Sequence, residues 1–223
     1  MMNKKVPALY KIGRFILKPI FLFYYNPKSI GHNKIPKEGP ILIVGNHKHI
    51  YDQCLTIIKT KRGIHYMAKK EYFDSKKTKW FFKGTGCISV DRSKKDEDAT
   101  KQALEVLKDG GAVGLFPEGT RNKTKEFLLP FKFGAVSLAK KTNATIVPFG
   151  ITGDYKFRSK NLTIRYGTPF KVGNMELEEA NNKLYKEVER LMKENLKEEK
   201  SNKRSKWYKW ELEKKQKEKS ENY

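Results

Sequence analysis

The fold of this chain is decided by residues 41–52, ILIVGNHKHIYD, and by residues 112–122, AVGLFPEGTRN. Each stretch begins with a short apolar run, which is typical of a strand that is buried on both faces of a sheet. Each run then passes through glycine or proline into charged residues. Ligands of open α/β sheets bind at the carboxyl ends of the strands, so the charged residues after these runs are the first candidates for a functional site.

Other short apolar runs alternate with helical patterns along the chain. The predicted strands cover residues 41–44, 64–68, 87–90, 112–116 and 145–149, with residues 162–166 as a later strand at an edge. The predicted helices cover residues 53–60, 78–83, 96–108, 133–141 and 176–196. Such alternation predicts an α/β fold with a mostly parallel central sheet flanked by helices.

Changes in composition divide the chain into four segments. We expect an amphipathic N-terminal segment over residues 1–35 and an α/β domain over 36–175, then a helix over 176–198 and a Lys/Glu-rich tail over 199–223. The 38% hydrophobic and 12% aromatic content excludes a chain that is disordered as a whole. The two cysteines, Cys54 and Cys87, lie far apart and predict buried thiols of a reducing compartment, with no disulfide.

Residues 8–25 have apolar side chains at helical spacing among Lys11, Arg14 and Lys18, which predicts an amphipathic helix that is kinked or restarted at Pro19. The apolar part is too short and too charged to span a bilayer. We expect this helix to lie in a membrane interface, or alternatively to pack on the domain's own sheet. The side chains expected in the acyl boundary are Phe15, Leu17, Phe21, Leu22 and Phe23.

The chain carries 48 Lys and Arg against 25 Asp and Glu, a formal net charge of +23. The segment from 193 to 223 holds 11 basic and 7 acidic residues, so most of the excess lies on the body of the protein. Such an excess indicates a polyanionic partner: nucleic acid, an anionic lipid surface or a phosphorylated substrate. The sequence contains no RNA- or DNA-binding motif, and we therefore expect no nucleic acid.

His47 follows the first predicted strand, and Asp52 comes five positions later, where the next helix should start. Across a turn, a carboxylate at this spacing reaches the Nδ1–H of the imidazole. The contact would fix the tautomer and leave Nε2 free as a general base. The alternative is that Asp52 is the N-cap of the helix and His47 an ordinary loop residue.

The sequence FPEGTR at 116–121 follows another predicted strand. Gly119 allows backbone N–H groups to approach a ligand, and the guanidinium of Arg121 matches a phosphate group. The alternative is a turn with a surface ion pair between Glu118 and Arg121. The sequence GCISVDR at 86–92 also ends a strand in a charged pair, and by itself this pair indicates a solvated turn.

Taken together, these blocks resemble the glycerolipid acyltransferases, and among them the bacterial 1-acyl-glycerol-3-phosphate acyltransferases. The four blocks of that family occur in order: His-x4-Asp at 47–52, G-x-I-x-V-D-R at 86–92, F-P-E-G-T-R at 116–121 and the apolar Val-Pro at 147–148. Residues 130–135 also resemble the family's segment after the third block. The resemblance covers residues 8 to 175. His49 departs from it, standing where many members carry a small polar residue. It either supports the site or faces the substrate, or it is a solvated loop residue.

The resemblance implies the reaction and the roles of the residues. An acyl chain would pass from an acyl carrier protein or coenzyme A thioester to the sn-2 hydroxyl of lysophosphatidic acid, giving phosphatidic acid for phospholipid biosynthesis. It implies His47 and Asp52 as the catalytic residues and Arg121 as the ligand of the acceptor's phosphate. Glu118 would orient the glycerol or Arg121, and Arg92 would add a second positive contact. The implied substrate-binding residues are Arg92, Glu118, Gly119, Thr120 and Arg121.

The resemblance also implies that the enzyme needs no metal or cofactor besides its acyl donor, and that it works as a peripheral protein on the cytoplasmic face of the cell membrane. Two alternatives stay open. Another acceptor of the same family, glycerol-3-phosphate or another lysophospholipid, would suit the same residues. A thioesterase, in which water replaces the acceptor hydroxyl, would not need a phosphate site.

Overall fold

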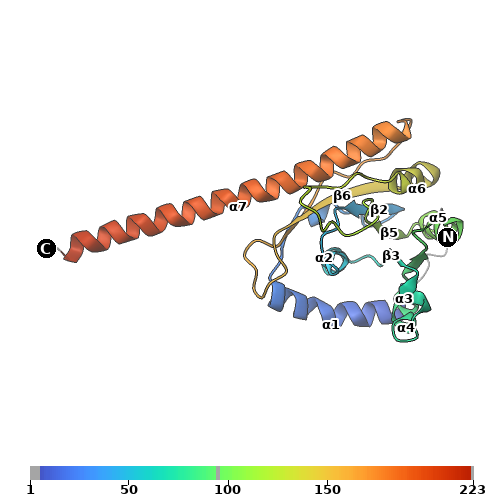
Figure 1. Cartoon of the computed structure of the whole chain (residues 1–223), viewed down its shortest axis with the longest axis horizontal. Coiled ribbons are helices and arrows are strands. Elements are labelled where there is room, and N and C mark those ends of the chain that lie inside the picture. The colour runs from blue at the N-terminus through green and yellow to red at the C-terminus, as the bar shows by residue number, and fades with distance from the viewer. Residues whose placement is uncertain (1–5, 94–95, 222–223) are drawn as a thin grey trace.

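The structure is a computed structural model that describes residues 6–93 and 96–221, with side chains described as far as residue 203. Its sheet has seven strands in the order β1-β7-β6-β2-β5-β3-β4 (Figure 1). All neighbouring strands are parallel except β6 and β7, which confirms the mostly parallel α/β fold. The strands are β1 (Lys28–Ile30), β2 (Ile41–Gly45), β3 (Ile64–Lys69), β4 (Ile88–Val90), β5 (Ala112–Leu115), β6 (Thr145–Thr152) and β7 (Thr163–Tyr166).

Helices cover both faces of this sheet. Figure 1 shows α7 and α6 above it and α1 and α2 below it. The helices are α1 (Ala8–Tyr25), α2 (Asp52–Ile57), α3 (Glu71–Asp74), α4 (Lys79–Gly84), α5 (Glu97–Lys108), α6 (Gly134–Thr142) and α7 (Leu177–Glu221), with a short 3-10 helix at His32–Lys34.

The central strands are apolar along their whole length because each face of the sheet has its own core. In β2, Leu42 and Val44 face the core shared with α5, α6 and α7, whereas Ile41 and Ile43 face the core shared with α1 and α2. All four side chains are fully buried. Burial of this kind stabilises the fold by about 1.5–3 kcal/mol for each large aliphatic side chain.

Three short elements were absent from the sequence-based prediction: β1, α3 and the 3-10 helix at His32–Lys34. The strand β1 has only three residues, and it pairs in parallel with β7 through Lys28 and Thr163. The prediction that residues 162–166 form an edge strand is therefore wrong, because β1 lies at that edge and β7 is enclosed. Neither β1 nor α3, with four residues, is long enough to show a hydrophobic period.

The helix α1 runs through Pro19 as one element and has two different faces. On one face the Tyr10 hydroxyl accepts a hydrogen bond from the backbone N–H of Ile64 at 3.1 Å. Phe21 is only 6% exposed and packs into the core below the sheet, while Leu22 is half-buried. The expectation that Phe21 faces a lipid is therefore wrong, because this residue fastens the helix to the domain. On the opposite face Phe15 is 83% exposed and Phe23 is 66% exposed.

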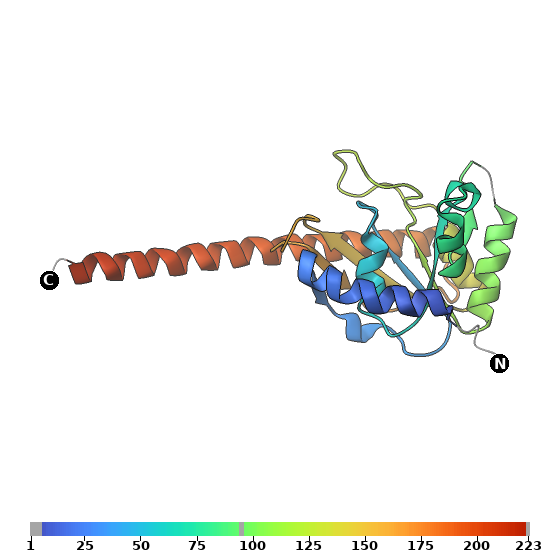
Figure 2. The same ribbon diagram turned by 90° about the horizontal axis from the view of Figure 1, so that it is seen from below.

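The helix α7 begins at the position expected and continues through the segment expected as a tail (Figures 1 and 2). Its first turns bury Leu184, Val188 and Met192 against the sheet. Further along, pairs four residues apart such as Lys193–Glu189 and Lys203–Glu199 support the exposed helix. Residues 1–5 of the expected N-terminal segment and 222–223 of the expected tail lie outside the described residues. In the described part of the chain, no helix has both the length and the apolar character that crossing a membrane requires.

Candidate active site

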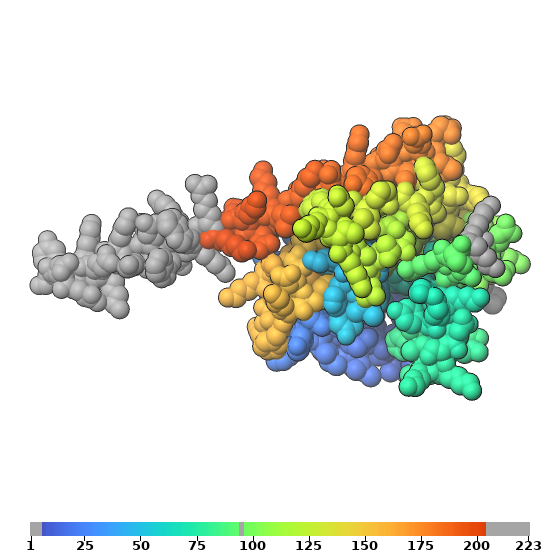
Figure 3. All heavy atoms as spheres, in the orientation of Figure 1, coloured from blue at the N-terminus to red at the C-terminus, as the bar shows by residue number. Residues whose placement is uncertain are grey.

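The register of the sheet brings two of the predicted motifs together. Because β2 and β5 are parallel and Val44 pairs with Leu115, the residues three positions beyond each pair, His47 and Glu118, are neighbours. The backbone N–H of His47 donates to Glu118 Oε1 at 2.6 Å, and the His47 carbonyl accepts from the N–H of Asn122 at 2.7 Å. The loop after β5 therefore holds both backbone polar groups of His47. In Figure 3 this loop (yellow-green) lies beside the segment that carries His47 (light blue).

His47 and Asp52 are in direct contact. The Nδ1–H of His47 donates to Asp52 Oδ2 at 2.8 Å, and the same oxygen accepts the backbone N–H groups of Lys48 at 2.7 Å and His49 at 2.8 Å. Asp52 is the first residue of α2 and is fully buried, while Tyr51 occupies the N-cap position without a side-chain cap. The carboxylate thus shapes the turn that carries the histidine, and the N-cap alternative does not describe it.

The ring of His47 is fixed from a second direction by an aromatic neighbour. It stacks on Phe116 with ring centres 3.9 Å apart and planes 10° apart. Before it, the side-chain amide of Asn46 pairs with the backbone of Ile151 as both donor and acceptor, at 3.0 and 2.7 Å, which ties the end of β2 to β6. With Nδ1 engaged by Asp52, Nε2 is the ring nitrogen available for chemistry.

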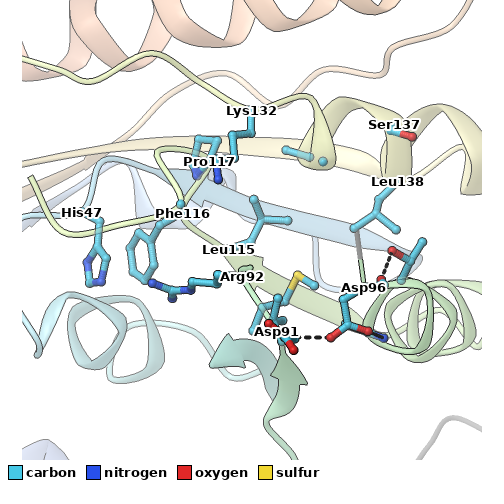
Figure 4. A pocket seen from close by; sticks show the side chains of 17 residues that line it. His47, Asp91, Arg92, Asp96, Leu115, Phe116, Pro117, Lys132, Ser137 and Leu138 are labelled. Carbon is cyan, nitrogen blue, oxygen red and sulfur yellow. Dashed lines mark hydrogen bonds between the residues drawn. The ribbon is translucent and has the colours of Figure 1, made fainter. Parts of the chain in front are cut away.

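A cavity of about 280 Å³ begins at His47 and extends between the sheet and the helices α5 and α6 (Figure 4). Its walls are largely apolar, formed by Met67, Val90, Leu115, Phe116, Ala135 and Leu138. Two cations, Arg92 and Lys132, and two carboxylates, Asp91 and Asp96, also line it. Figure 4 shows the Arg92 side chain extended past Phe116 toward His47. The arrangement places a base, an apolar volume and positive charge within one site.

Glu118 is buried, and each of its two carboxylate oxygens accepts a hydrogen bond from a backbone N–H group. Its Oε1 is bound by the N–H of His47 and its Oε2 by the N–H of Leu129 at 3.1 Å. Burial raises the pKa of this carboxyl, the two backbone donors oppose the shift, and the nearby charge of Asp52 adds to it. Among the described residues no ion pair joins Glu118 to Arg121. Glu118 therefore braces the loops of the site, and the ion-pair alternative is wrong.

The remaining predicted residues fall on two sides of His47. Gly119 lines the cavity with φ at +71°, and the end of the Lys132 side chain lies over it. Thr120 is exposed and Arg121 half-buried, and neither is among the described residues that line the cavity. Arg121 is close enough to His49 for its positive charge to act on that imidazole. Burial is the main cause that lowers the pKa of His49, and the charge of Asp52 opposes the shift. The positive charge of Arg121 lowers the pKa further.

Two residues of the site were not predicted. Lys132 lies in the PFKFGA segment, where a lone cation among apolar neighbours beside the third block is the signal that could have identified it. Tyr155, in the loop after β6, donates its hydroxyl to Asp52 Oδ1 at 2.6 Å. Its ring also stacks on His49, with centres 4.2 Å apart and planes 19° apart, so His49 is a packed residue rather than a solvated one. No sequence pattern marks Tyr155, because it lies 103 positions from Asp52.

Comparisons with known proteins agree with this geometry. A 1-acyl-sn-glycerol-3-phosphate acyltransferase of Bacillus subtilis is 32% identical over 146 residues, which is 65% of this chain and 72% of that protein. Its counterpart in Borreliella burgdorferi is 29% identical over 139 residues, covering 61% of this chain and 55% of that protein. The crystal structure of the lysophosphatidic acid acyltransferase PlsC from Thermotoga maritima superposes with a TM-score of 0.66 at 25% identity, over 83% of this chain and 77% of that one.

The sequence model of the Acyltransferase family matches residues 26–152. That range includes the His47–Asp52 pair and the residues after β4 and β5 that line the cavity. It also includes the strands β1 to β6 of the sheet. It covers more than half of the chain, and this chain therefore belongs to the acyltransferase family.

Proposed function

We propose that the protein is a 1-acyl-sn-glycerol-3-phosphate acyltransferase, which moves an acyl chain from a thioester to the sn-2 hydroxyl of lysophosphatidic acid and produces phosphatidic acid. The observation that carries the proposal is the His47–Asp52 pair, which opens onto an apolar cavity lined by Arg92 and Lys132. The names of the relatives agree with this activity.

The chemistry proposed for His47 needs one proton transfer in each direction. Nε2 accepts the proton of the acceptor hydroxyl as that oxygen attacks the thioester carbonyl carbon. Asp52 stabilises the imidazolium that forms, since its carboxylate accepts the Nδ1–H. The tetrahedral intermediate then expels the thiolate, the carbon–sulfur bond breaks, and the imidazolium returns the proton to sulfur. The products are the ester and the free thiol.

The cavity suits the two unlike parts of the substrates. Its apolar walls fit an acyl chain, which gains free energy by leaving water. For the acceptor's phosphate we propose Arg121 beside His49, with Arg92 as a further positive contact. Lys132, which lies over Gly119, is a further cation inside the cavity, as Arg92 is.

The raised pKa values of the two cysteines favour direct transfer of the acyl chain, without a covalent acyl-enzyme. Burial is the main cause that raises the pKa of Cys54 to about 12, and it also raises the pKa of Cys87. A thiol with so high a pKa is not a nucleophile at neutral pH. The acyl donor we propose is a thioester of acyl carrier protein or coenzyme A, both of which carry negative charge that the basic body would attract.

We also propose that the exposed face of α1 docks on an anionic membrane at the cytoplasmic side of the cell membrane. The exposed side chains Phe15 and Phe23 stand near the cations Lys11 and Lys18 on the same helix. Two further exposed aromatic side chains belong to segments that contact α1: Trp80 lies on α4, which packs against α1, and Phe157 contacts Phe23. Apolar rings with flanking cations are what an amphipathic helix presents to the boundary between headgroups and acyl chains.

The docking proposal is tested with the double variant Phe15→Asp/Phe23→Asp in a flotation assay on anionic vesicles. Because both side chains are exposed, we expect release from the vesicles with an unchanged melting temperature. Phe21→Asp is the matched control, and it should lower the melting temperature because Phe21 is in the core. High salt should weaken the binding of the unmodified protein in part, since screening acts on the lysines but not on apolar insertion. Full binding by the double variant would contradict the proposal.

The activity is tested by acyl transfer from thioester donors to a panel of acceptors with and without a phosphate. We expect transfer to lysophosphatidic acid and little to its dephosphorylated counterpart. Preference for glycerol-3-phosphate or another lysophospholipid would move the protein to another acceptor within the family. Release of free fatty acid without any acylated acceptor would instead support a thioesterase and refute the proposal.

A further inference from the structure

A residue outside the four sequence blocks helps to hold the side chain of Asp52 in place. The inference drawn from it rests on His47 and Asp52 being the catalytic pair, as proposed above. We propose that Tyr155 is a positioning residue, whose hydroxyl holds the second oxygen of Asp52 and so sets the plane of the carboxylate against His47.

The hydrogen bonds of Asp52 divide unevenly between its two oxygens. Oδ2 accepts three hydrogen bonds, from the ring of His47 and from the N–H groups of Lys48 and His49. Oδ1 accepts one, from the Tyr155 hydroxyl at 2.6 Å. A turn about the Cβ–Cγ bond would move both oxygens, so it would break the three hydrogen bonds to Oδ2 together with the one to Oδ1. The hydrogen bond from Tyr155 therefore adds to the resistance against this rotation from the opposite side of the carboxylate, and it also satisfies a charged atom in a fully buried residue.

Tyr155 remains a donor under the conditions in which the enzyme would work. Burial, followed by the negative charge of Asp52 and the hydrogen bond to it, raises the pKa of this phenol well above its usual value. The hydroxyl therefore keeps its proton at neutral pH. A carboxylate can only accept, so the direction of this hydrogen bond is fixed.

The loop of Tyr155 is itself held from two sides. On one side, Lys48 Nζ donates to the carbonyl of Gly153, which joins the loop to the turn between His47 and Asp52. On the other side, the N–H of Arg158 donates to the carbonyl of Tyr24 at 2.5 Å, and Phe157 packs on the ring of Tyr24 with centres 5.2 Å apart. Tyr155 therefore connects Asp52 to the C-terminal end of α1, the helix we expect on the membrane.

The direct test is Tyr155→Phe, which removes the hydroxyl and keeps the ring that stacks on His49. We expect kcat to fall about ten- to a hundredfold, in line with the loss of one charge-assisted hydrogen bond, while both KM values stay within about twofold. Tyr166→Phe is the matched control. Its hydroxyl is buried and has no hydrogen-bond partner among the residues that the structure describes, so removing it should leave kcat unchanged. A Tyr155→Phe enzyme with unchanged kcat would overturn the proposal.

A double-mutant cycle with Asp52→Asn separates positioning from a general loss of structure. An asparagine would keep its oxygen toward the three donors and turn its NH₂ group toward Tyr155, so the tyrosine would have no charge to hold. Tyr155→Phe should then lower kcat by less than about threefold in the Asp52→Asn background. Equal losses in both backgrounds would show that Tyr155 acts through packing and would overturn the proposal, whatever the melting temperatures. His47→Ala keeps the two proposals distinct, because the unmodified rate in that variant would contradict the proposed role of His47 as the base, whatever the result for Tyr155→Phe.

Discussion

Replacing Glu118 by glutamine tests how the structure builds the site. Both carboxylate oxygens accept a backbone N–H, from His47 at 2.6 Å and from Leu129 at 3.1 Å. A glutamine has one oxygen, so its NH₂ group must face one of these two donors. One N–H then loses its partner in a buried place, and the other loses the charge of its acceptor.

The magnitude follows from these two losses. A buried polar group left without a partner costs about 1–3 kcal/mol, and a hydrogen bond to a charged group is worth about 1.5–3 kcal/mol against about 1 for a neutral one. Together they predict a loss of about 1.5–5 kcal/mol in the free energy of unfolding. For a chain of this size that corresponds to a melting temperature lower by about 3–20 °C. We expect kcat to fall as well, since the backbone of His47 moves.

The assay pairs a thermal melt with initial-rate kinetics in which each substrate is varied in turn. Glu126→Gln is a matched control on the same loop, where the side chain is exposed, and it should change neither quantity. A Glu118→Gln variant with a normal melting temperature and a higher KM for the acceptor alone would refute this reasoning. That result would assign Glu118 to the acceptor's glycerol, as the sequence resemblance implies.

The other predictions concern the cations and the glycine of the site. Arg121→Ala should raise the KM for the phosphorylated acceptor about tenfold or more, because one charge-assisted contact to that substrate is lost. The KM for the thioester should stay nearly unchanged. An equal rise in both KM values would show that Arg121 only shapes the loop. Arg92→Ala, measured beside it, should raise the same KM by less, and the reverse order would place the phosphate in the cavity. Gly119→Ala should lower the melting temperature by a few degrees for two reasons. A left-handed φ costs a non-glycine residue about 1–2 kcal/mol, and the new methyl group displaces the end of the Lys132 side chain. Gly13→Ala, in a helix with open space around it, should instead be neutral or stabilising, and equal effects of the two changes would contradict the role of φ.

The predictable part of the fold was the part set by local patterns. The strands β2 and β5 are long enough and apolar enough to be read directly, and their parallel pairing then places His47 beside Glu118. The contact between His47 and Asp52 was one of two arrangements that the spacing allowed, and the structure shows this contact with Tyr51 rather than Asp52 at the N-cap.

The rest depended on contacts between residues far apart in the chain. Phe21 and Phe23 look alike in the sequence, yet one is buried in the core and the other is exposed, because only the docking of α1 on the sheet distinguishes their faces. The role of Glu118 depends on two backbone N–H groups, which no side-chain pattern records. Tyr155 reaches Asp52 only because the end of β6 lies beside the end of β2.

The central claim is that His47 is the base for acyl transfer to a phosphorylated acceptor. It is tested most directly by the initial rate of phosphatidic acid formation from lysophosphatidic acid and an acyl thioester by His47→Ala, with a melting temperature recorded for the same preparation. His32→Ala, on the exposed 3-10 helix at His32–Lys34, is the matched control. We expect a folded His47→Ala protein whose rate is lower by about 10²–10⁴-fold, with the His32 variant unaffected. A folded His47→Ala protein that forms phosphatidic acid at the unmodified rate would show that His47 is not the base.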